Sequence, residues 1–183
     1  MSLRLWRPEP TVAFGRLDAL RPGYDEAVRA AREHGFAPLL REPGGHAVAY
    51  HRGSLVLELE GAGGLDGIRA RFEATANRIA EALRELGVDA RVGPVPGEYC
   101  AGDFSVNLEG RVKLAGLAQR VRSGRFTLGA SIVCEDPEPI RAVLVAVYAA
   151  LALEVDPATV GVPGPPIGAV EATLLSVFST VEP

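Results

Sequence analysis

Two side chains in one stretch of this chain could carry out group transfer. Cys100 lies in the segment Gly97-Glu-Tyr-Cys-Ala-Gly-Asp-Phe104, where glycines and polar residues flank the thiol and predict that it is accessible. A thiolate beside a cation is a good acyl acceptor. Lys113 is the only lysine in the sequence, and its ammonium is a compact charge that can reach one oxygen in a pocket. Taken alone, Cys100 leaves a structural role equally open, and a chain this rich in arginine could keep one lysine by chance.

The other thiol and the histidines give weaker signals. Cys134 closes an apolar run and is expected to be buried packing. His46 and His51 could each serve as a base for a thiol, with an ordinary strand or rim histidine as the alternative. Two distant cysteines and three histidines have no ligand spacing, so no metal site is expected.

A second segment, Arg41-Glu-Pro-Gly-Gly-His-Ala-Val-Ala-Tyr50, contains the paired glycines Gly44 and Gly45 between strand-like runs. Paired glycines let the backbone turn sharply or approach a ligand closely, and Arg41 could supply a fixed cation. The spacing fits neither a phosphate loop nor a dinucleotide fingerprint. An ordinary hairpin turn is the simpler alternative.

In their order along the chain, these segments resemble the lipoate–protein ligase and octanoyltransferase family, which shares the catalytic fold of the biotin ligases. The similarity covers roughly residues 3–161, with departures at Pro43, Tyr50 and His51, where the family often has Ser or Thr, His, and Asp. The matching residues are Arg41, Gly44, Gly45, Ala47 and Val48 in the glycine turn, then Gly110, Lys113, Gly116, Gln119 and Arg120. Tyr99, Cys100, Gly102 and Phe104 resemble the cysteine-using acyltransferase branch.

The resemblance implies an acyltransferase that moves an octanoyl or lipoyl group without a cofactor. Cys100 would take the acyl group as a thioester while Lys113 holds its carbonyl oxygen. The donor would be an acylated protein, and the acceptor a lysine of an acidic lipoyl domain or of the glycine-cleavage H protein. The substrate-binding residues that the resemblance implies are Arg41, Gly44, Gly45, His46, Ala47, Gly116 and Gln119.

Two other functions remain open. One is an ATP-dependent lipoate–protein ligase, using ATP and Mg, in which Lys113 binds a lipoyl-adenylate and Cys100 is incidental. The other is a non-catalytic module that binds lipoylated proteins or acyl groups.

Strand-like runs followed by helices, without regular alternation, predict an α+β fold with a mixed, largely antiparallel sheet and flanking helices. This resembles the biotin/lipoate protein ligase catalytic domain, and residues 1–183 are expected to form a single domain. No accessory C-terminal domain is expected, and the family's leading helix is expected to be missing. The predicted strands are 3–6, 11–14, two runs within 46–60, 104–108, 114–122 and 126–134, and the predicted helices are 24–34, 68–86, 137–153 and 169–179.

Three local details accompany this prediction. The strand 104–108 should have one polar face, carrying Ser105 and Asn107. Asp136 and Pro137 form an expected N-cap and N1 pair. Residues 163–166, rich in proline, predict a rigid connector before the last helix.

Composition and charge limit the classes of partner and the location that can be expected. A net charge of −4 gives no general attraction to nucleic acid or anionic membranes. There is no secretory signal, and the longest apolar run, 142–153, is too short to span a membrane, so a cytoplasmic location is expected. The stretch 110–134 has no acid and is either a solvated strand face or a positive patch for an acidic partner. Its basic residues are Arg111, Lys113, Arg120, Arg122 and Arg125.

Overall fold

A computed structural model of the chain describes residues 1–161 and 164–179, which form two sheets and four α-helices. The large sheet contains β1 (Ser2–Trp6), β5 (Ser54–Ala62), β6 (Ala90–Val92), β7 (Val106–Leu108), β8 (Val112–Arg122) and β9 (Arg125–Val133). The small sheet contains β2 (Thr11–Phe14), β3 (Ala37–Leu40) and β4 (Val48–Tyr50). The helices are α1 (Tyr24–Glu33), α2 (Ile68–Glu85), α3 (Pro137–Ala150) and α4 (Ile167–Ser179).

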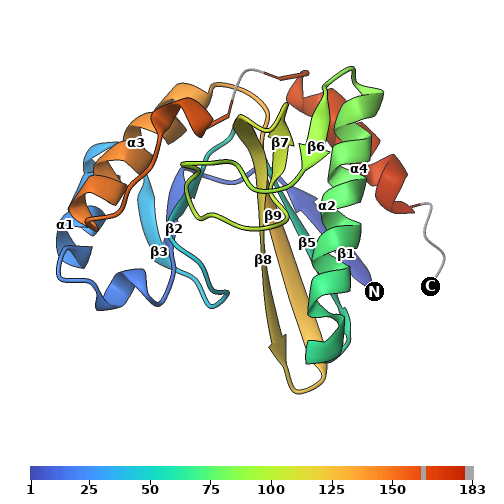
Figure 1. The fold of residues 1–183 in the computed structure, drawn as a ribbon, viewed down its shortest axis with the longest axis horizontal. Helices are drawn as coiled ribbons and strands as arrows, with labels where there is room; N and C mark the ends of the chain where they lie inside the picture. The colour runs from blue at the N-terminus through green and yellow to red at the C-terminus, as the bar shows by residue number, and fades with distance from the viewer. Residues whose placement is uncertain (162–163, 180–183) are drawn as a thin grey trace.

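The two sheets differ in topology. The large sheet is antiparallel throughout, in the order β1-β5-β9-β8-β7-β6, whereas the small sheet has the order β3-β2-β4 with β2 and β3 parallel. Helices α1 and α3 lie beside the small sheet, α2 and α4 lie beside the large one, and the β8–β9 hairpin projects from the body (Figure 1). The predicted α+β class with a largely antiparallel arrangement is confirmed.

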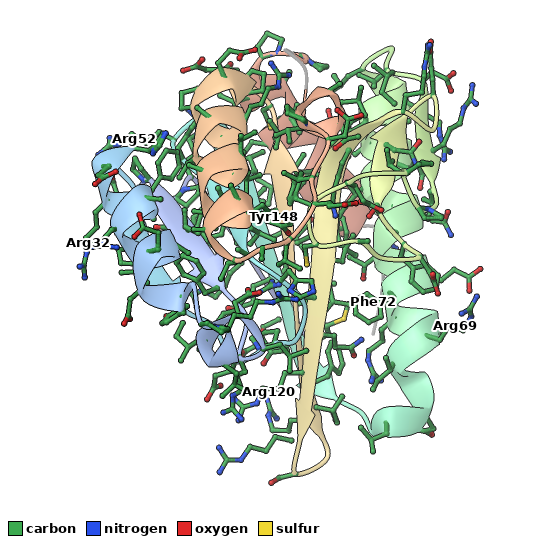
Figure 2. The ribbon with its side chains drawn as sticks, turned by 60° about the vertical axis from the view of Figure 1, so that its left-hand side comes forward. Arg32, Arg52, Arg69, Phe72, Arg120 and Tyr148 are labelled. Carbon is green, nitrogen blue, oxygen red and sulfur yellow. The ribbon has the colours of Figure 1, made fainter. Side chains whose placement is uncertain are left out.

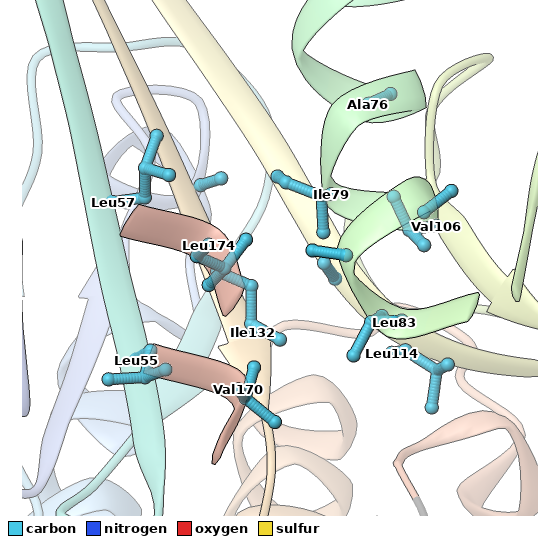
Figure 3. Packing of buried hydrophobic residues seen from close by; sticks show 14 of the residues in the cluster. Leu55, Leu57, Ala76, Ile79, Leu83, Val106, Leu114, Ile132, Val170 and Leu174 are labelled. Atoms are coloured by element: carbon cyan, nitrogen blue, oxygen red, sulfur yellow. The ribbon is translucent and has the colours of Figure 1, made fainter. Parts of the chain in front are cut away.

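One face of the large sheet is filled with large aliphatic side chains. The alternation predicted for β5 turns Leu55, Leu57 and Leu59 to this face, where all three are buried. Leu174 of α4 and Ile79 of α2 pack on the same core, as Figure 3 shows. Burying each such side chain contributes about 1.5–3 kcal/mol, so this face, called the filled face below, holds the large sheet and its two helices together.

The opposite face of the same strands carries small side chains and faces the small sheet. Because side chains alternate between faces, the cross-strand pairs of β5, β8 and β9 place these residues together. This small-residue face consists of Val56, Gly116, Ala118, Gly129 and Ser131.

The predicted strand 104–108 is too long, since only β7 forms there. Its polar face is buried, with Ser105 and Asn107 only 3% and 2% exposed. The Asn107 amide donates to the Gly93 carbonyl at 3.0 Å and accepts from the Gly110 N–H at 2.7 Å. These partners come from loops, and one of them follows β6, a strand that the sequence did not predict.

Two details at helix starts can be compared with the sequence. Asp136 occupies the N-cap position and Pro137 begins α3, as predicted, but Asp136 has a left-handed backbone (φ +46°) and its side chain makes no capping hydrogen bond. Pro163, in the predicted connector, lies outside the described residues, and α4 begins at Ile167. Within the described ranges, no helix is both long and apolar enough to cross a membrane.

Candidate functional site

The structure brings Cys100 and Lys113 into direct contact. Cys100 lies in the loop between β6 and β7, and the Lys113 ammonium at the start of β8 donates to the Cys100 carbonyl at 2.9 Å. A register shift between β7 and β8, typical of a β-bulge, occurs beside Lys113. A Cβ added at Gly116 would lie 2.9 Å from the Lys113 Cε, so the lysine lies along the small-residue face.

Lys113 is buried in an ion pair that the sequence did not reveal. Its ammonium is 2.8 Å from Glu98 Oε2, and the exposed fractions of the two side chains are 1% and 0%. It also donates to the Tyr99 carbonyl at 2.9 Å. The three N–H groups of the ammonium therefore have three partners, one charged and two neutral. Glu98 stands in a loop rich in glycine and proline, where no periodic pattern distinguishes a buried carboxylate from a solvated one.

The backbone of Cys100 is fixed at both ends. Its N–H donates to the Tyr148 hydroxyl at 2.6 Å, which in turn donates to the Ala47 carbonyl at 3.0 Å. Burial, more than neighbouring charge, raises the pKa of Tyr148, so the hydroxyl remains a donor. Cys100 has φ +42°, a left-handed conformation that costs about 1–2 kcal/mol outside glycine. The hydrogen bonds that Lys113 and Tyr148 make to the Cys100 backbone offset this strain. The two hydrogen bonds of Tyr148 were not predicted from the sequence.

Arg41 places a cation beside the sulfur. Its Nη2 lies 3.4 Å from Cys100 Sγ and also donates to the His46 carbonyl at 2.9 Å. Arg41 has no carboxylate partner in the part of the chain that the structure describes, and its buried Nε–H has no hydrogen-bond partner there. Because Glu98 balances Lys113, the uncompensated charge beside the thiol belongs to Arg41.

The glycine turn passes next to the sulfur. Gly45 has φ +93°, and a Cβ there would lie 2.7 Å from Cys100 Sγ, so a side chain is excluded by conformation and by space. Gly44 has open space around it. His46 Nδ1 is 2.8 Å from Asp18 Oδ1, and this fully buried carboxylate also accepts from the Gly15 N–H. The His46 imidazole therefore links the glycine turn to the segment around Asp18.

His51 holds a turn together, which favours the structural alternative over a base for the thiol. Its Nδ1 accepts from the Gly53 N–H at 2.7 Å and its Nε2 donates to the Asp136 carbonyl at 2.8 Å. Both ring nitrogens are used in a buried turn, and the ring makes no contact with Cys100 among the described residues.

The Gln119 side chain on β8 is hydrogen-bonded to α2. Its amide oxygen accepts from Arg71 Nε at 2.5 Å and its amide nitrogen donates to the Ile68 carbonyl at 3.2 Å. These bonds join β8 to the first turn of α2, from which Phe72 points toward β8 (Figure 2).

Two cavities meet at Cys100 and Lys113. The slot, of about 130 Å³, lies between the sheets. The vestibule, of about 320 Å³, opens beside the glycine turn. The two cavities share Cys100, Lys113, Leu117 and Ala118. The slot is otherwise lined by the rest of the small-residue face with Ala13, Arg41, Pro43, Val48, Tyr50 and Ala130. The vestibule is lined by Gly44, Gly45, Phe72, Ala101, Gly102, Asp103, Phe104, Ser105, Leu117, Ala118 and Gln119.

Three of the five basic side chains in the predicted positive stretch, residues 110–134, are paired with carboxylates. Lys113 is buried against Glu98, Arg111 pairs with Glu109, and Arg120 pairs with Glu42. Arg122 and Arg125 are paired across the tip of the hairpin and have no ion pair within the described ranges. The available positive surface is therefore the hairpin tip. No three His, Cys, Asp or Glu side chains among residues 1–161 and 164–179 could hold a metal ion together.

The domain therefore combines a two-sheet α+β fold with a thiol at the junction of a slot and an open vestibule. The family described as "Lipoyl protein ligase A/B catalytic domain" matches residues 1–152, and the chain belongs to this family.

Two relatives of the same name are similar to the chain in sequence. An octanoyl-[GcvH]:protein N-octanoyltransferase of Exiguobacterium sibiricum is 31% identical over 155 residues, 84% of this chain and 56% of that protein. The protein of the same name in Geobacillus kaustophilus is 33% identical over 67% of this chain and 44% of its own length. The chain thus spans about half the length of these relatives.

Solved structures share the fold. The bi-partite lipoate protein ligase of Thermoplasma acidophilum has a TM-score of 0.67 at 24% identity, over 97% of this chain and 69% of its own. Lipoate-protein ligase A bound with ATP has a TM-score of 0.61 at 17% identity, over 97% and 81%. The expected resemblance to the lipoate ligase catalytic fold is confirmed.

Proposed function

We propose that the chain is an acyltransferase that moves an octanoyl or lipoyl group to a lysine amine through a thioester on Cys100. The observation that carries this proposal is the position of the sulfur, at the junction of the slot and the vestibule with Arg41 at 3.4 Å. The proposed site keeps Cys100 and Lys113 at its centre, with Arg41, Gly44, Gly45, His46, Ala47, Gly116 and Gln119 around them.

The slot suits the acyl chain. Its floor is the small-residue face, where the absence of large side chains leaves an apolar passage that ends at the thiol. Each methylene that leaves water contributes about 0.8 kcal/mol. Burial raises the pKa of the Tyr50 hydroxyl in the wall of the slot, an effect that Arg41 partly opposes.

The vestibule suits the lysine arm of the donor and then of the acceptor. In the first step the Cys100 sulfur attacks the acyl carbonyl carbon, the C–S bond forms, and the C–N bond to the donor lysine breaks. The thiol proton leaves with the released amine. In the second step the acceptor amine attacks the thioester, the C–S bond breaks, and a proton returns to sulfur. The balance needs no oxidant, metal or nucleotide.

Two donors are available for the negative charge that develops on the acyl oxygen. Arg41 has the buried Nε–H without a partner. Lys113 can exchange one of its two backbone carbonyl partners for the acyl oxygen. One such donor changes the rate of acyl transfer by about 10²–10³-fold.

For the partners, we propose the glycine-cleavage H protein as one protein that carries the acyl group, because the relatives are octanoyl-[GcvH]:protein N-octanoyltransferases. We further propose an acidic lipoyl domain as acceptor, which Arg122 and Arg125 at the hairpin tip would attract. Both cysteines are free thiols, which suits the cytoplasmic location that we propose.

The test is to incubate the protein with an octanoylated donor, with and without ATP, and to measure intact mass before and after hydroxylamine. A hydroxylamine-labile octanoyl adduct is expected without ATP. It should be absent from Cys100→Ser and present in the matched control Cys134→Ser.

A lipoate ligase is the second candidate, because solved neighbours of the same fold have that name. Transfer that requires ATP and survives Cys100→Ser would establish the ligase and contradict the thioester. Acyl binding with neither adduct nor transfer would identify a non-catalytic binding module.

A further inference from the structure

We propose that Glu98 is the positioning residue of the site, the anion that keeps the Lys113 ammonium charged and aimed at Cys100. Its side chain is completely buried. One carboxylate oxygen accepts from the Val95 N–H at 3.0 Å. The other accepts from Ser105 Oγ at 2.6 Å and lies 2.8 Å from Lys113 Nζ.

The ammonium needs this partner because of where it lies. An isolated charge taken out of water is strongly destabilised unless an opposite charge and hydrogen bonds compensate it. Lys113 is 1% exposed, and its other two partners, the carbonyls of Tyr99 and Cys100, are neutral. Glu98 is the only carboxylate paired with it among the residues that the structure describes.

Glu98 also fixes the direction of the lysine. It is held from both sides of the cysteine in sequence, by the Val95 N–H before it and by Ser105 after it. Lys113 crosses between this anchor and the backbone of Cys100. On the proposed transferase function, the acyl oxygen displaces one carbonyl from Lys113 while Glu98 stays in place. The ammonium then keeps its aim through both steps.

The first experiment relocates the charge. Glu98→Gln keeps the shape of the side chain and removes its charge, and we expect a fall of about 100-fold in kcat with a much smaller change in the KM for the donor. Ser105→Asp, added to Glu98→Gln, puts a carboxylate within reach of the same ammonium, because Ser105 Oγ already contacts the oxygen that pairs with Lys113. The double variant should recover at least about 10-fold of the loss.

A purely structural role would not be rescued by a shorter acid at another position. Full activity of Glu98→Gln, or a folded double variant that recovers nothing, would overturn the proposal.

The second experiment covers a Glu98→Gln variant that does not fold. Lys113→Met with Glu98→Gln removes both charges, a replacement that buried ion pairs often tolerate. If Glu98 acts through Lys113, the double variant is more stable to denaturant than Lys113→Met alone, because no buried charge is left without its partner. A further loss of stability on adding Glu98→Gln would show an independent role and overturn the proposal.

The third experiment separates this inference from the proposed function. Because Lys113 is the only lysine in these 183 residues, a sample labelled with ¹⁵N-lysine gives one side-chain nitrogen signal. The shift of a charged, slowly exchanging ammonium is expected in the wild type and in the Glu98→Gln/Ser105→Asp variant, and its loss in Glu98→Gln. This result needs no acyl donor, so it stands even if no transfer is observed. An unchanged signal in Glu98→Gln would refute the role of Glu98 alone.

Discussion

On its filled face the large sheet carries Leu55, Leu57 and Leu59 of β5, packed against α2 and α4. On its other face the same sheet carries Val56 of β5 with Gly116, Gly129 and other small residues of β8 and β9, and these border a cavity. The filled face excludes water and stabilises the sheet, whereas the small-residue face leaves volume that an acyl chain can occupy. A rigid wall packed from behind can keep an empty slot in front of it.

The comparison predicts the largest effect at the charged end of the small-residue face. Lys113→Ala leaves Glu98 buried without its counter-ion, which costs about 3–5 kcal/mol of the free energy of unfolding. Acyl transfer should be abolished as well. Chemical denaturation and the transfer assay measure the two losses, and Arg111→Ala, two residues away and exposed, serves as the control. Retained full activity in Lys113→Ala would mean that the site is wrongly assigned.

The filled face should respond in stability alone. Leu57→Ala removes a fully buried side chain from the core between β5 and the helices, and we expect a loss of about 2–5 kcal/mol. Below its unfolding temperature, the rate per folded molecule and the preference for acyl chain length should equal those of the wild type. A change in chain-length preference would mean that the two faces are not independent.

The small-residue face should respond in specificity. Gly129→Leu puts a side chain into the slot, since a Cβ there would meet only the Leu57 carbonyl, at 4.0 Å. Octanoyl transfer should fall by about 10-fold or more, while a butanoyl donor is still used. The free energy of unfolding should change by less than about 1.5 kcal/mol. Competition between the two donors measures the preference, and an equal loss for both would argue against the slot as the acyl site.

The hairpin tip lies outside both faces and should have a weaker effect. Arg122→Glu with Arg125→Glu is expected to raise the KM for an acidic acceptor by about 5-fold at low salt, because exposed charge pairs contribute little each. Acylation of Cys100 by a small thioester should be unchanged. Arg32→Glu with Arg29→Glu on α1, away from the hairpin where Arg32 lies (Figure 2), reverses the same number of charges and is the matched control. Equal effects of the two changes would remove the tip from the docking surface.

The two cysteines give the smallest effect at neutral pH. Burial, reinforced by Glu135, raises the pKa of Cys134 to about 12, so iodoacetamide at pH 8 should modify Cys100 and leave Cys134 intact. The raised pKa belongs to the folded state. The stability that it contributes is therefore complete below the unfolded value of about 8.5 and is lost as the pH rises toward 12. Cys134→Ala should flatten this alkaline decline in unfolding measurements, and an unchanged decline would contradict it.

The sequence predicted those parts of the fold that depend on local periodicity. Alternation in Leu55, Leu57 and Leu59 predicted β5, and the apolar stripe of residues 68–86 predicted α2. It did not predict β6, which has only three residues, nor the division of the strands into two sheets, since pairing partners are set by contacts distant along the chain. The sequence showed Ser105 and Asn107 only as the polar face of a strand. Nothing near them in sequence indicates that Glu98 and Gly93 would accept their hydrogen bonds inside the protein.

For the candidate site, the sequence singled out the two central residues that we propose and missed the residues that contact them. Cys100 and Lys113 were distinguished by residue type and by the family resemblance, and the structure places them in contact. Asp18, Glu98 and Tyr148 were missed. Each acts through a contact with a residue distant in sequence, such as Tyr148 on the Cys100 amide. A carboxylate in a turn and a tyrosine on an apolar helix have no signature that separates them from ordinary surface or core residues.

The burial of Lys113 has one more consequence, for the protein as a target of its own chemistry. A chain proposed to attach acyl groups to lysine amines presents no accessible lysine within these 183 residues, because its only one is 1% exposed and every other basic side chain of the Lys and Arg type is an arginine. A guanidinium stays protonated at neutral pH and does not attack a thioester. On the proposed function, an acyl group held on Cys100 would therefore meet no competing side-chain amine on the surface of its own chain, and the lysine of the partner would be the amine that receives it.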